Sequence, residues 1–374
     1  MYSFFGVPVK LNIVNLKYKD ILLNELKVYK INSEAESNTL LITDDWCDFQ
    51  HQILANNPST HIFCKNVIYI KDKLVNVAFE FDSNKRLIKV FFKLNFAKNS
   101  IHRYLRKWLN MQFTNRIENI GQIFHESIMV PLTFFYENLV PIHASGVVIN
   151  NQAFLLGGTG GVGKTTIELD LCLHQNYAFL TDDIAIVNTN EQVYPNHNSP
   201  KIYGYNLGGN KKLKSKLFKN ETIIGKLQWL FHKYIFGLNK VRRKISTFQL
   251  YQNVAEKPKY LNAYFILNKN NCKKMSIEKL AIDEAIKMSL EVIMTEYSYF
   301  FNHIRFHVYN SISCNLKPII TVKELETKWK KNLFKILEEK DIRIINIPLT
   351  IEHTKFKVEM NSLIKEEINL NLNK

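Results

Sequence analysis

The amino-acid sequence predicts an α/β protein with a mixed sheet over residues 138–348. A smaller α+β domain, residues 1–137, precedes this region, and a polar tail, residues 349–374, follows it. Beyond residue 137, apolar strand-like segments alternate with segments of helical periodicity, which is typical of a layered α/β core. Two of these segments, Val147–Ile149 and Ala153–Leu155, are separated by only two residues, so the sheet contains an antiparallel pair.

The first 137 residues predict strands and helices that do not alternate. The expected strands are Ser3–Ile13, Thr39–Thr43 and the hairpin pair Leu74–Phe81 and Arg86–Leu94, and the expected helices are Ile101–Gln112 and Ile120–Tyr136. The acidic pair Asp44-Asp45 is interpreted as a loop or a helix start rather than a metal site. No catalytic constellation occurs in this region, so we expect a recognition or packing domain.

Asn150 and Asn151 form the predicted turn of the antiparallel pair, because asparagine tolerates the positive φ that a two-residue hairpin requires. If so, the residue numbers of paired positions add to 301. This register puts His143 opposite Gly158, at the point where the second strand ends. A histidine without function at a hairpin end is the alternative interpretation.

A glycine-rich loop follows the second strand and matches the pattern GxxxxGK[ST] at every fixed position. Its residues are Gly158, Thr159, Gly160, Gly161, Val162, Gly163, Lys164 and Thr165. Such a loop points successive backbone N–H groups at phosphate oxygens, and the helix that follows adds its positive N-terminal end. The lysine reaches the β- and γ-phosphates, and the threonine hydroxyl ligates Mg²⁺. The sequence therefore predicts binding of a nucleoside triphosphate with Mg²⁺.

Two adjacent acids, Asp182 and Asp183, follow the short apolar segment Tyr177–Thr181. This segment predicts a strand that runs parallel to the loop strand, and ligands bind at the carboxyl ends of such strands. Because adjacent residues of a strand point to opposite faces, one carboxylate can face Mg²⁺ while the other faces an incoming hydroxyl. A helix cap or turn without function is the alternative.

Five further elements complete the predicted chain. They are strands at Leu261–Leu267, His303–Tyr309 and Ile342–Ile347 and helices at Ile282–Met294 and Val322–Glu339.

Three short segments resemble the C-terminal catalytic domain of the bacterial HPr kinase/phosphorylase family and its HPr-kinase-like relatives. They read HASGVV, GGTGGVGKTT and FLTDD, recur in that order, and lie within about 50 residues. The fold of that family is shared with ATP-dependent phosphoenolpyruvate carboxykinase. The resemblance implies that the loop, with Thr166, binds ATP and that Thr165 and Asp182 hold Mg²⁺. It further implies that Asp183 is the base and that His143 flanks the phosphates.

The same resemblance leads us to expect an arginine on the γ-phosphate, for which Arg242 or Arg243 is the candidate. It also implies a homo-oligomer. Two departures point away from HPr itself as the acceptor. HPr kinases proper have an acid directly after the loop's Ser/Thr, whereas this chain has Thr166, and their Glu-Ile-Arg-Gly-Leu-Gly-type run is missing between Ile184 and Lys244.

The expected activity is therefore transfer of the γ-phosphoryl group of ATP to a hydroxyl, with a serine of a peptide or protein as the acceptor. Two alternatives stay open. The acceptor can be a small-molecule hydroxyl, or the chain can be a nucleotide-gated regulatory protein that uses a basic segment to bind a partner.

Composition limits the class of protein. The chain has 374 residues, of which 46% are hydrophobic and 22% charged, so a disordered chain is excluded. Five scattered cysteines without a CxxC pair argue against a disulfide framework and a cysteine zinc site. Because no apolar run spans a bilayer and no basic leader precedes the first apolar residues, a cytoplasmic protein without a membrane span is expected.

The net charge of +16 is concentrated in one segment, residues 209–244. It contains 11 lysines and arginines and a single acid, Glu221. A solvated insertion, a phosphate-facing lid, a site for an acidic partner and a nucleic-acid site are the possible interpretations. Nucleic acid is the least favoured, because no base-reading motif accompanies the segment.

Overall fold

The computed structural model describes residues 1–32, 38–46, 53–57, 61–95, 108, 119–175, 177–208, 210–219 and 221–372. The protein is a mixed α/β structure, and its chain divides into two compact units. Unit 1 comprises Met1–Ser100, Ile117–Glu137 and Ile293–Trp329, and unit 2 comprises Ile101–Arg116, Asn138–Val292 and Lys330–Lys374. Residues 293–329, assigned in the sequence analysis to the ATP-binding region, thus group with the first unit.

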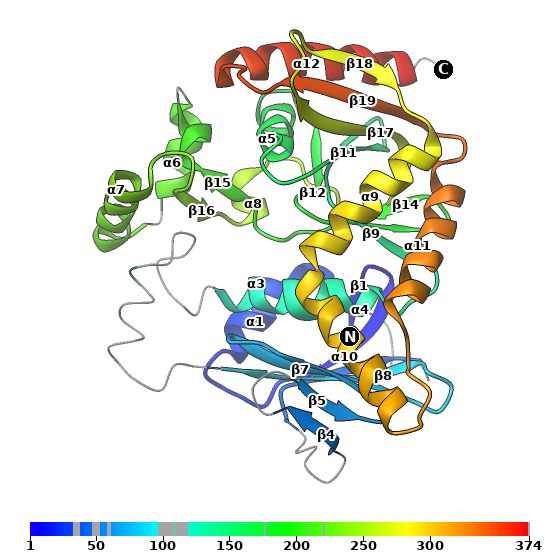
Figure 1. The fold of residues 1–374 in the computed structure, drawn as a ribbon. Coiled ribbons are helices and arrows are strands. Elements are labelled where there is room, and N and C mark those ends of the chain that lie inside the picture. Colours follow the sequence, from blue (N-terminus) through cyan, green and yellow to red (C-terminus); the bar gives the residue numbers. More distant parts are fainter. Residues whose placement is uncertain are drawn as a thin grey trace. The chain divides into compact units, whose positions relative to one another are not determined.

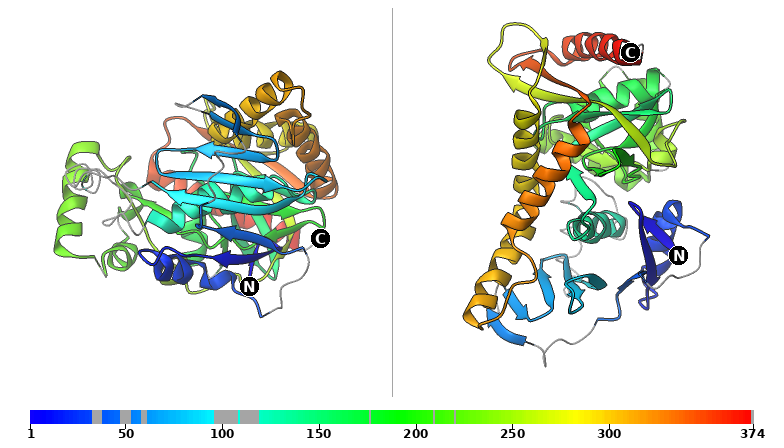
Figure 2. Two further views of the ribbon diagram at one scale, coloured as in Figure 1. Left: turned by 90° about the horizontal axis from the view of Figure 1, so that it is seen from below. Right: turned by 90° about the vertical axis from the view of Figure 1, so that its right-hand side faces the viewer.

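The sheet of unit 1 has eight strands in the order β1-β2-β3-β8-β7-β6-β5-β4, and its strands lie side by side in Figure 2. The strands are β1 (Tyr2–Phe4), β2 (Val7–Asn12), β3 (Leu40–Thr43), β4 (Ile53–Asn57), β5 (His61–Cys64), β6 (Val67–Lys71), β7 (Val75–Phe81) and β8 (Leu87–Leu94). β3 runs parallel to both of its neighbours, and every other pair is antiparallel. The predicted hairpin of β7 and β8 is confirmed.

The prediction of one strand over Ser3–Ile13 is wrong. Phe5 and Gly6 both have positive φ, 53° and 84°, and fold the segment into the hairpin of β1 and β2. Glycine at the second turn position makes this reversal inexpensive. Asp44, directly after β3, accepts hydrogen bonds from the backbone of Val14 and Asn15, so it closes a loop as expected.

The described helices of unit 1 lie in three parts of the chain. They are α1 (Lys19–Leu26) with η1 (Lys27–Tyr29), the continuous run of α3 (Ile120–Phe124), the π-helical η4 (His125–Met129) and α4 (Val130–Thr133), and α10 (Ser298–Ser313). The second run confirms the helix predicted over Ile120–Tyr136. The helix predicted over Ile101–Gln112 lies outside the described residues, except Trp108.

The strand predicted at His303–Tyr309 is wrong, because these residues belong to α10. Phe300, Phe301, Ile304 and His307 are buried at helical spacing. Two further helices, α9 (Ile282–Glu296) and α11 (Val322–Leu337), start in one unit and end in the other, and both confirm predicted helices.

The main sheet of unit 2 has nine strands and mixed pairing (Figure 1). The strands are β9 (Leu139–Ile142), β10 (Ala144–Ile149), β11 (Gln152–Gly157), β12 (Ala178–Thr181), β13 (Ala185–Asn188), β14 (Gln192–Tyr194), β17 (Lys259–Asn270), β18 (Ser276–Lys279) and β19 (Asp341–Pro348). β11 pairs in parallel with β17, and β17 pairs in parallel with β19. The strands predicted at Leu261–Leu267 and Ile342–Ile347 are therefore confirmed.

The hairpin of β10 and β11 has the predicted register. Ala144 pairs with Gly157, the numbers of all paired positions add to 301, and Asn150 and Asn151 have φ values of 47° and 66°. β12 runs parallel in direction to β11, as predicted, but β10 lies between them and pairs antiparallel with both.

Helices α5 (Lys164–His174) and α12 (His353–Leu372) pack together over one face of this sheet. Their side chains share a core with the sheet, to which Ile167, Phe179, Phe265 and Phe356 belong. The residues expected to form a polar tail are therefore mostly helical. Phe356, Met360, Ile364 and Ile368 recur every four residues and are buried.

The basic segment of unit 2 forms two helices beside a two-stranded sheet. They are α6 (Lys211–Phe218) and α7 (Ile223–Phe236), and the strands are β15 (Lys201–Tyr203) and β16 (Arg242–Lys244), with the short helices η5 (Gly204–Leu207) and α8 (Thr247–Leu250) close by in the chain. Among the helices that the structure describes, none has the length and apolar character needed to span a bilayer.

Candidate active site

The glycine-rich loop joins β11 to α5, and three of its glycines have positive φ. The values are 128° for Gly158, 80° for Gly161 and 106° for Gly163. A Cβ on Gly158 would lie 2.5 Å from the carbonyl oxygen of Leu267, and one on Gly163 would lie 2.3 Å from the ring of Phe356. Backbone conformation and space therefore both require glycine at these two positions. Gly160 and Gly161 face open space instead.

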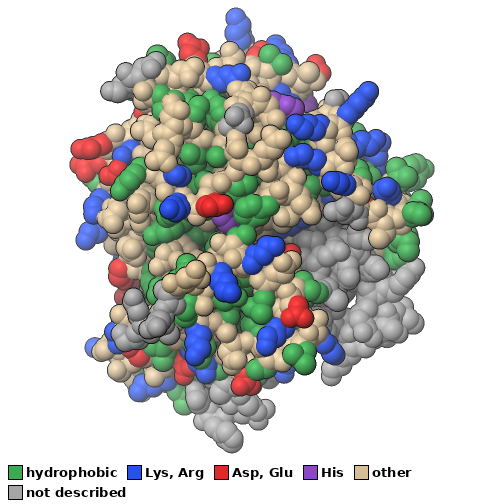
Figure 3. Space-filling view, turned by 180° about the vertical axis from the view of Figure 1, so that it is seen from behind, with side chains coloured by type: hydrophobic (Ala, Val, Ile, Leu, Met, Phe, Trp, Pro, Cys, Tyr) green, Lys and Arg blue, Asp and Glu red, His purple; other side chains and the backbone are tan. Residues whose placement is uncertain are grey.

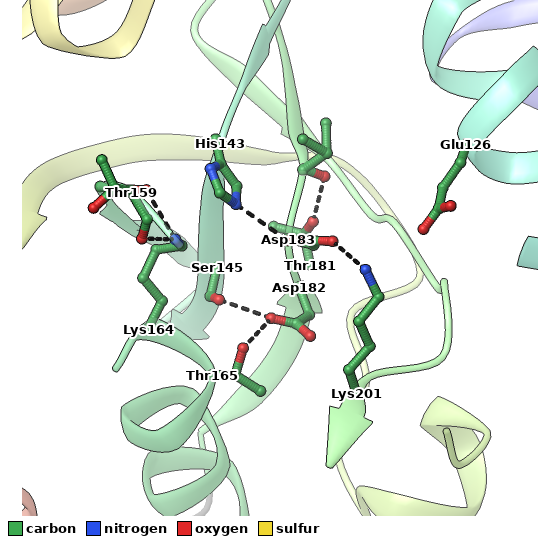
Figure 4. Close-up of polar contacts among 12 residues, drawn as sticks. Glu126, His143, Ser145, Thr159, Lys164, Thr165, Thr181, Asp182, Asp183 and Lys201 are labelled. Carbon is green, nitrogen blue, oxygen red and sulfur yellow. Dashed lines mark hydrogen bonds and ion pairs between the residues drawn. The ribbon is translucent and has the colours of Figure 1, made fainter. Parts of the chain in front are cut away.

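Lys164 curls back over this loop from the first position of α5. Its side chain is buried, and its Nζ donates hydrogen bonds to the carbonyl oxygens of Gly158 (2.8 Å) and Thr159 (2.9 Å), as Figure 4 shows. The ammonium group is thus held on the loop, where it can contact an anion bound by the loop. Val162 points into the core below.

Asp182 lies directly after β12 and is 5% exposed. Its Oδ1 accepts hydrogen bonds from the hydroxyls of Thr165 (2.8 Å) and Ser145 (2.9 Å). Burial, and next the charge of Asp183, raise the pKa of Asp182, while the two hydroxyl donors oppose the shift. A cation at this carboxylate would relieve that cost.

Asp183 turns the other way and has a left-handed backbone, with φ of 73°. Its Oδ1 lies 3.1 Å from Nε2 of His143, and its Oδ2 accepts from Nζ of Lys201 at 3.0 Å (Figure 4). Burial favours a raised pKa, but the hydrogen bond from His143 and the positive charge of Lys201 outweigh it. The pKa of Asp183 is therefore held well below its usual range, and the carboxylate is ionised at neutral pH.

Thr165 and Asp182 offer the hard oxygen ligands that Mg²⁺ prefers. Their oxygens already lie within hydrogen-bond distance of each other, and Thr165 directly follows Lys164 at the end of the glycine-rich loop. No group of three or more His, Cys, Asp or Glu side chains suited to a metal occurs among the described residues. A magnesium ion in a nucleotide site does not need one, because it takes one or two protein ligands and completes its shell with phosphates and water. The donor set therefore fits Mg²⁺.

Thr166, the second residue of α5, contacts residues that follow β15. Its hydroxyl accepts from Nδ2 of Asn206 at 3.4 Å and hydrogen-bonds to Tyr205. The ring of Tyr205 stacks on that of Tyr203 with centroids 5.4 Å apart. The loop and the start of its helix are thus supported from η5.

The two candidate arginines do not join these residues. Arg243 is buried against α7, where its guanidinium donates to Gln228 at 3.0 Å and lies 3.6 Å from Glu221. Arg242 lies over the ring of Tyr203, 5.6 Å from its centroid. Of the residues singled out from sequence, the structure brings together His143, Asp182, Asp183, Lys164 and Thr165, and it leaves both arginines outside the contacts of the carboxylates.

Three further residues belong to the site and were not identified from sequence. Ser145 of β10 could have been found, because it lies two residues after His143, which directly precedes this strand, and residues two apart in an extended segment face the same side. Lys201 carries no local signal, because only the pairing of β15 with β16 brings it to Asp183. Glu168 is fully buried one turn along α5, and burial, followed by the charge of Asp182, raises its pKa well above the usual value.

Comparisons with known proteins give little guidance. The chain matches no protein-family model, and a search of curated proteins finds no match. Among solved structures, the HPr(Ser) kinase/phosphatase from Coxiella burnetii is similar over 63% of this chain and 99% of that chain. The identity is 13% and the TM-score 0.27, so this likeness supports no conclusion about the present chain.

Proposed function

We propose that this protein is an ATP- and Mg²⁺-dependent kinase that transfers the γ-phosphoryl group to a hydroxyl, with a serine of a peptide or protein as the acceptor. One observation carries the proposal. Beside a glycine loop that ends in Lys164 and Thr165, two neighbouring carboxylates have opposite environments, Asp182 among hydroxyls and Asp183 between His143 and Lys201. Two such environments suit one carboxylate to a metal and the other to a proton.

The loop and Lys164 would bind the phosphates of ATP. Backbone N–H groups at the start of α5 and the ammonium group neutralise the negative charge of the phosphate oxygens. Thr165 and Asp182 would hold Mg²⁺, which would supply positive charge to stabilise the negative charge that develops in transfer. Phe356, packed against Gly163, holds the loop in this conformation.

Asp183 would accept the proton of the incoming hydroxyl. The acceptor oxygen bonds to the γ-phosphorus, its proton goes to the carboxylate of Asp183, and the bond from phosphorus to the β–γ bridging oxygen breaks, releasing ADP. A carboxylate with a low pKa can serve, because the loose transition state of phosphoryl transfer asks mainly for orientation of the hydroxyl. His143 and Lys201 orient the carboxylate for this role.

Transfer from labelled ATP to candidate acceptors tests the proposal. The full chain is incubated with Mg²⁺ and either serine-containing peptides or small alcohols. Asp183→Asn should lower transfer by about 10²–10⁴-fold, the usual contribution of a general base, while ATP binding persists. Asp283→Asn, at an exposed acid of α9, is the matched control and should have no effect. Transfer by Asp183→Asn at the wild-type rate would contradict the role of the base, and ATP hydrolysis without any acceptor would favour a nucleotide-gated protein.

A further inference from the structure

Helix α7 exposes an unusual number of apolar side chains. Of the 23 large hydrophobic residues that are exposed in the described part of the chain, seven lie on α7, and an eighth, Leu238, lies two residues beyond its end. Tyr234 is 88% exposed, Ile223 78%, and Leu227 54%. Scattered exposed hydrophobics are common, but such a concentration on one helix marks an interaction surface.

These side chains form a single stripe along the helix. At about 100° per residue, positions 223, 224, 227, 230, 231, 234 and 235 all fall on one side. The opposite side carries Gly225, Gln228, Trp229 and His232, which are buried. The packing of unit 2 thus uses mainly the other face of α7. Phe231 also makes an edge contact with the ring of Trp108, 6.2 Å between centroids, and the apolar side chains of the stripe, about 21 Å long, are otherwise exposed.

Lysines flank the stripe. Lys226 and Lys233 are exposed on its edge, and with Lys211 and Lys214 of α6 they line a pocket of about 680 Å³. The floor of this pocket is apolar, with Phe218 and Trp229 among its residues, and none of the described residues that line it is acidic. The acid of the segment, Glu221, is 3.6 Å from the guanidinium of Arg243. Figure 3 shows green apolar and blue basic side chains side by side at the right-hand edge, where this segment lies.

The charge pattern of this surface indicates which kind of partner binds it. A second copy of the chain in a two-fold contact would bring lysines against lysines, which is unfavourable. An acidic helical peptide binds in a long apolar groove, whereas the stripe on α7 is the convex side of a helix. A bilayer interface accepts a convex apolar helix to the depth of its acyl chains, and its anionic headgroups pair with the flanking lysines.

We infer that α6 and α7 bind the surface of a membrane that contains anionic lipids. The apolar stripe of α7 enters the region between headgroups and acyl chains. The four pocket lysines contact lipid phosphates, and the apolar pocket floor takes up part of an acyl chain. The helix lies in the interface plane, so the association is peripheral and reversible. The inference is independent of the proposed kinase activity.

Vesicle co-sedimentation of the full chain tests this inference. We expect binding to vesicles that contain phosphatidylserine in phosphatidylcholine, much weaker binding to phosphatidylcholine alone, and a decrease as salt is raised. The triple change Ile223→Ser, Leu227→Ser, Tyr234→Ser should weaken binding at least about tenfold. The double change Lys226→Gln, Lys233→Gln should weaken it by roughly the same factor.

Matched variants change equal numbers of exposed residues elsewhere. Tyr309→Ser, Ile312→Ser, Val358→Ser and, separately, Lys330→Gln, Lys331→Gln should bind vesicles as the wild type does. Circular dichroism and sedimentation without vesicles check that every variant is folded and dispersed. Three results would overturn the inference: no binding to anionic vesicles, equal loss in the matched variants, or a wild-type dimer that the stripe variant dissolves.

Discussion

The residues around the glycine loop and the residues of α6 and α7 both include many polar side chains, but the environments of these side chains are opposite. Asp182, Lys164 and His143 are buried and each contacts a defined partner. The lysines of α6 and α7 are mostly exposed and lie beside exposed apolar side chains. Burial makes an interaction strong and dependent on geometry, whereas exposure makes it weak, additive and sensitive to salt.

The comparison teaches that single substitutions should have large effects at the loop and small ones on α7. At the loop, removing one partner leaves another buried group uncompensated. On α7, water takes the place of a truncated side chain, so no buried group loses its partner. The following predictions test this difference, from the largest expected effect to the smallest.

Lys164→Ala should weaken ATP binding by roughly 30-fold or more, because truncating one partner of a buried charged contact costs about 2–5 kcal/mol. Titration calorimetry with ATP and Mg²⁺ measures the change. Lys330→Ala, at an exposed position of α11, should bind ATP as the wild type does. Equal affinities for wild type and Lys164→Ala would show that the loop does not hold the phosphates.

Gly163→Ala should lower the free energy of unfolding by roughly 2 kcal/mol, since it places a Cβ at positive φ and against the ring of Phe356. Gly160→Ala is its control, because φ there is not positive and no heavy atom lies within 4 Å of the new Cβ. Chemical denaturation compares the two. Similar destabilisation by both changes would mean that α12 does not constrain the loop.

Glu168→Gln should stabilise the fold at neutral pH by on the order of 1 kcal/mol. Burial, and then the charge of Asp182, raise the pKa of Glu168 in the folded state, so folding retains a proton that the unfolded chain releases above about pH 4.3. The glutamate therefore lowers the free energy of unfolding, and this loss grows as the pH rises. Melting temperatures measured from pH 4 to pH 8 should diverge with pH, and parallel curves would exclude this explanation.

Lys201→Met should lower transfer severalfold, mainly at acidic pH. Burial raises the pKa of Asp183, and the hydrogen bond of His143 and the charge of Lys201 lower it. Without the lysine the pKa of Asp183 rises, so this carboxylate becomes protonated at a higher pH. The acidic limb of the pH–rate profile therefore moves to higher pH. Lys340→Met, which removes an ion pair with Glu191 instead, should leave the profile unchanged.

Tyr234→Ser should change the free energy of unfolding by no more than about 0.5 kcal/mol, because the side chain is 88% exposed. The same change at Tyr264, which is 1% exposed, should cost several kcal/mol by opening a cavity. Thermal unfolding of the two variants measures the contrast. A large loss in Tyr234→Ser would mean that the stripe on α7 contributes to the packing of unit 2.

Local sequence signals predicted the centre of the candidate site. The Asn150-Asn151 turn fixes the register of β10 and β11, and this register predicted the position of His143. The spacing of the glycines identified the loop. Both depend on residues close in the chain, for which backbone preferences are decisive. Lys201 could not be predicted, because its position depends on a pairing with Lys244, far along the chain.

Two elements were predicted wrongly, because the apolar residues of one segment can match more than one kind of secondary structure. Residues 303–309 alternate between polar and apolar, as a strand does, yet the buried positions of α10 recur at helical spacing. The length of the surrounding segment decides for the helix. In residues 353–372 the buried apolar side chains recur every four residues among many polar ones, so the polar composition concealed an amphipathic helix.

The contact between Phe356 and Gly163 has a practical consequence for cloning. A shortened gene that stops at residue 348 would look reasonable, because the sequence of residues 349–374 is polar and suggests a dispensable tail. It would also discard the aromatic ring of Phe356, which lies against Gly163 of the glycine-rich loop. We expect such a truncated protein to express poorly or to lose affinity for nucleotide, and the cause would then lie at the end of the chain rather than in the loop itself.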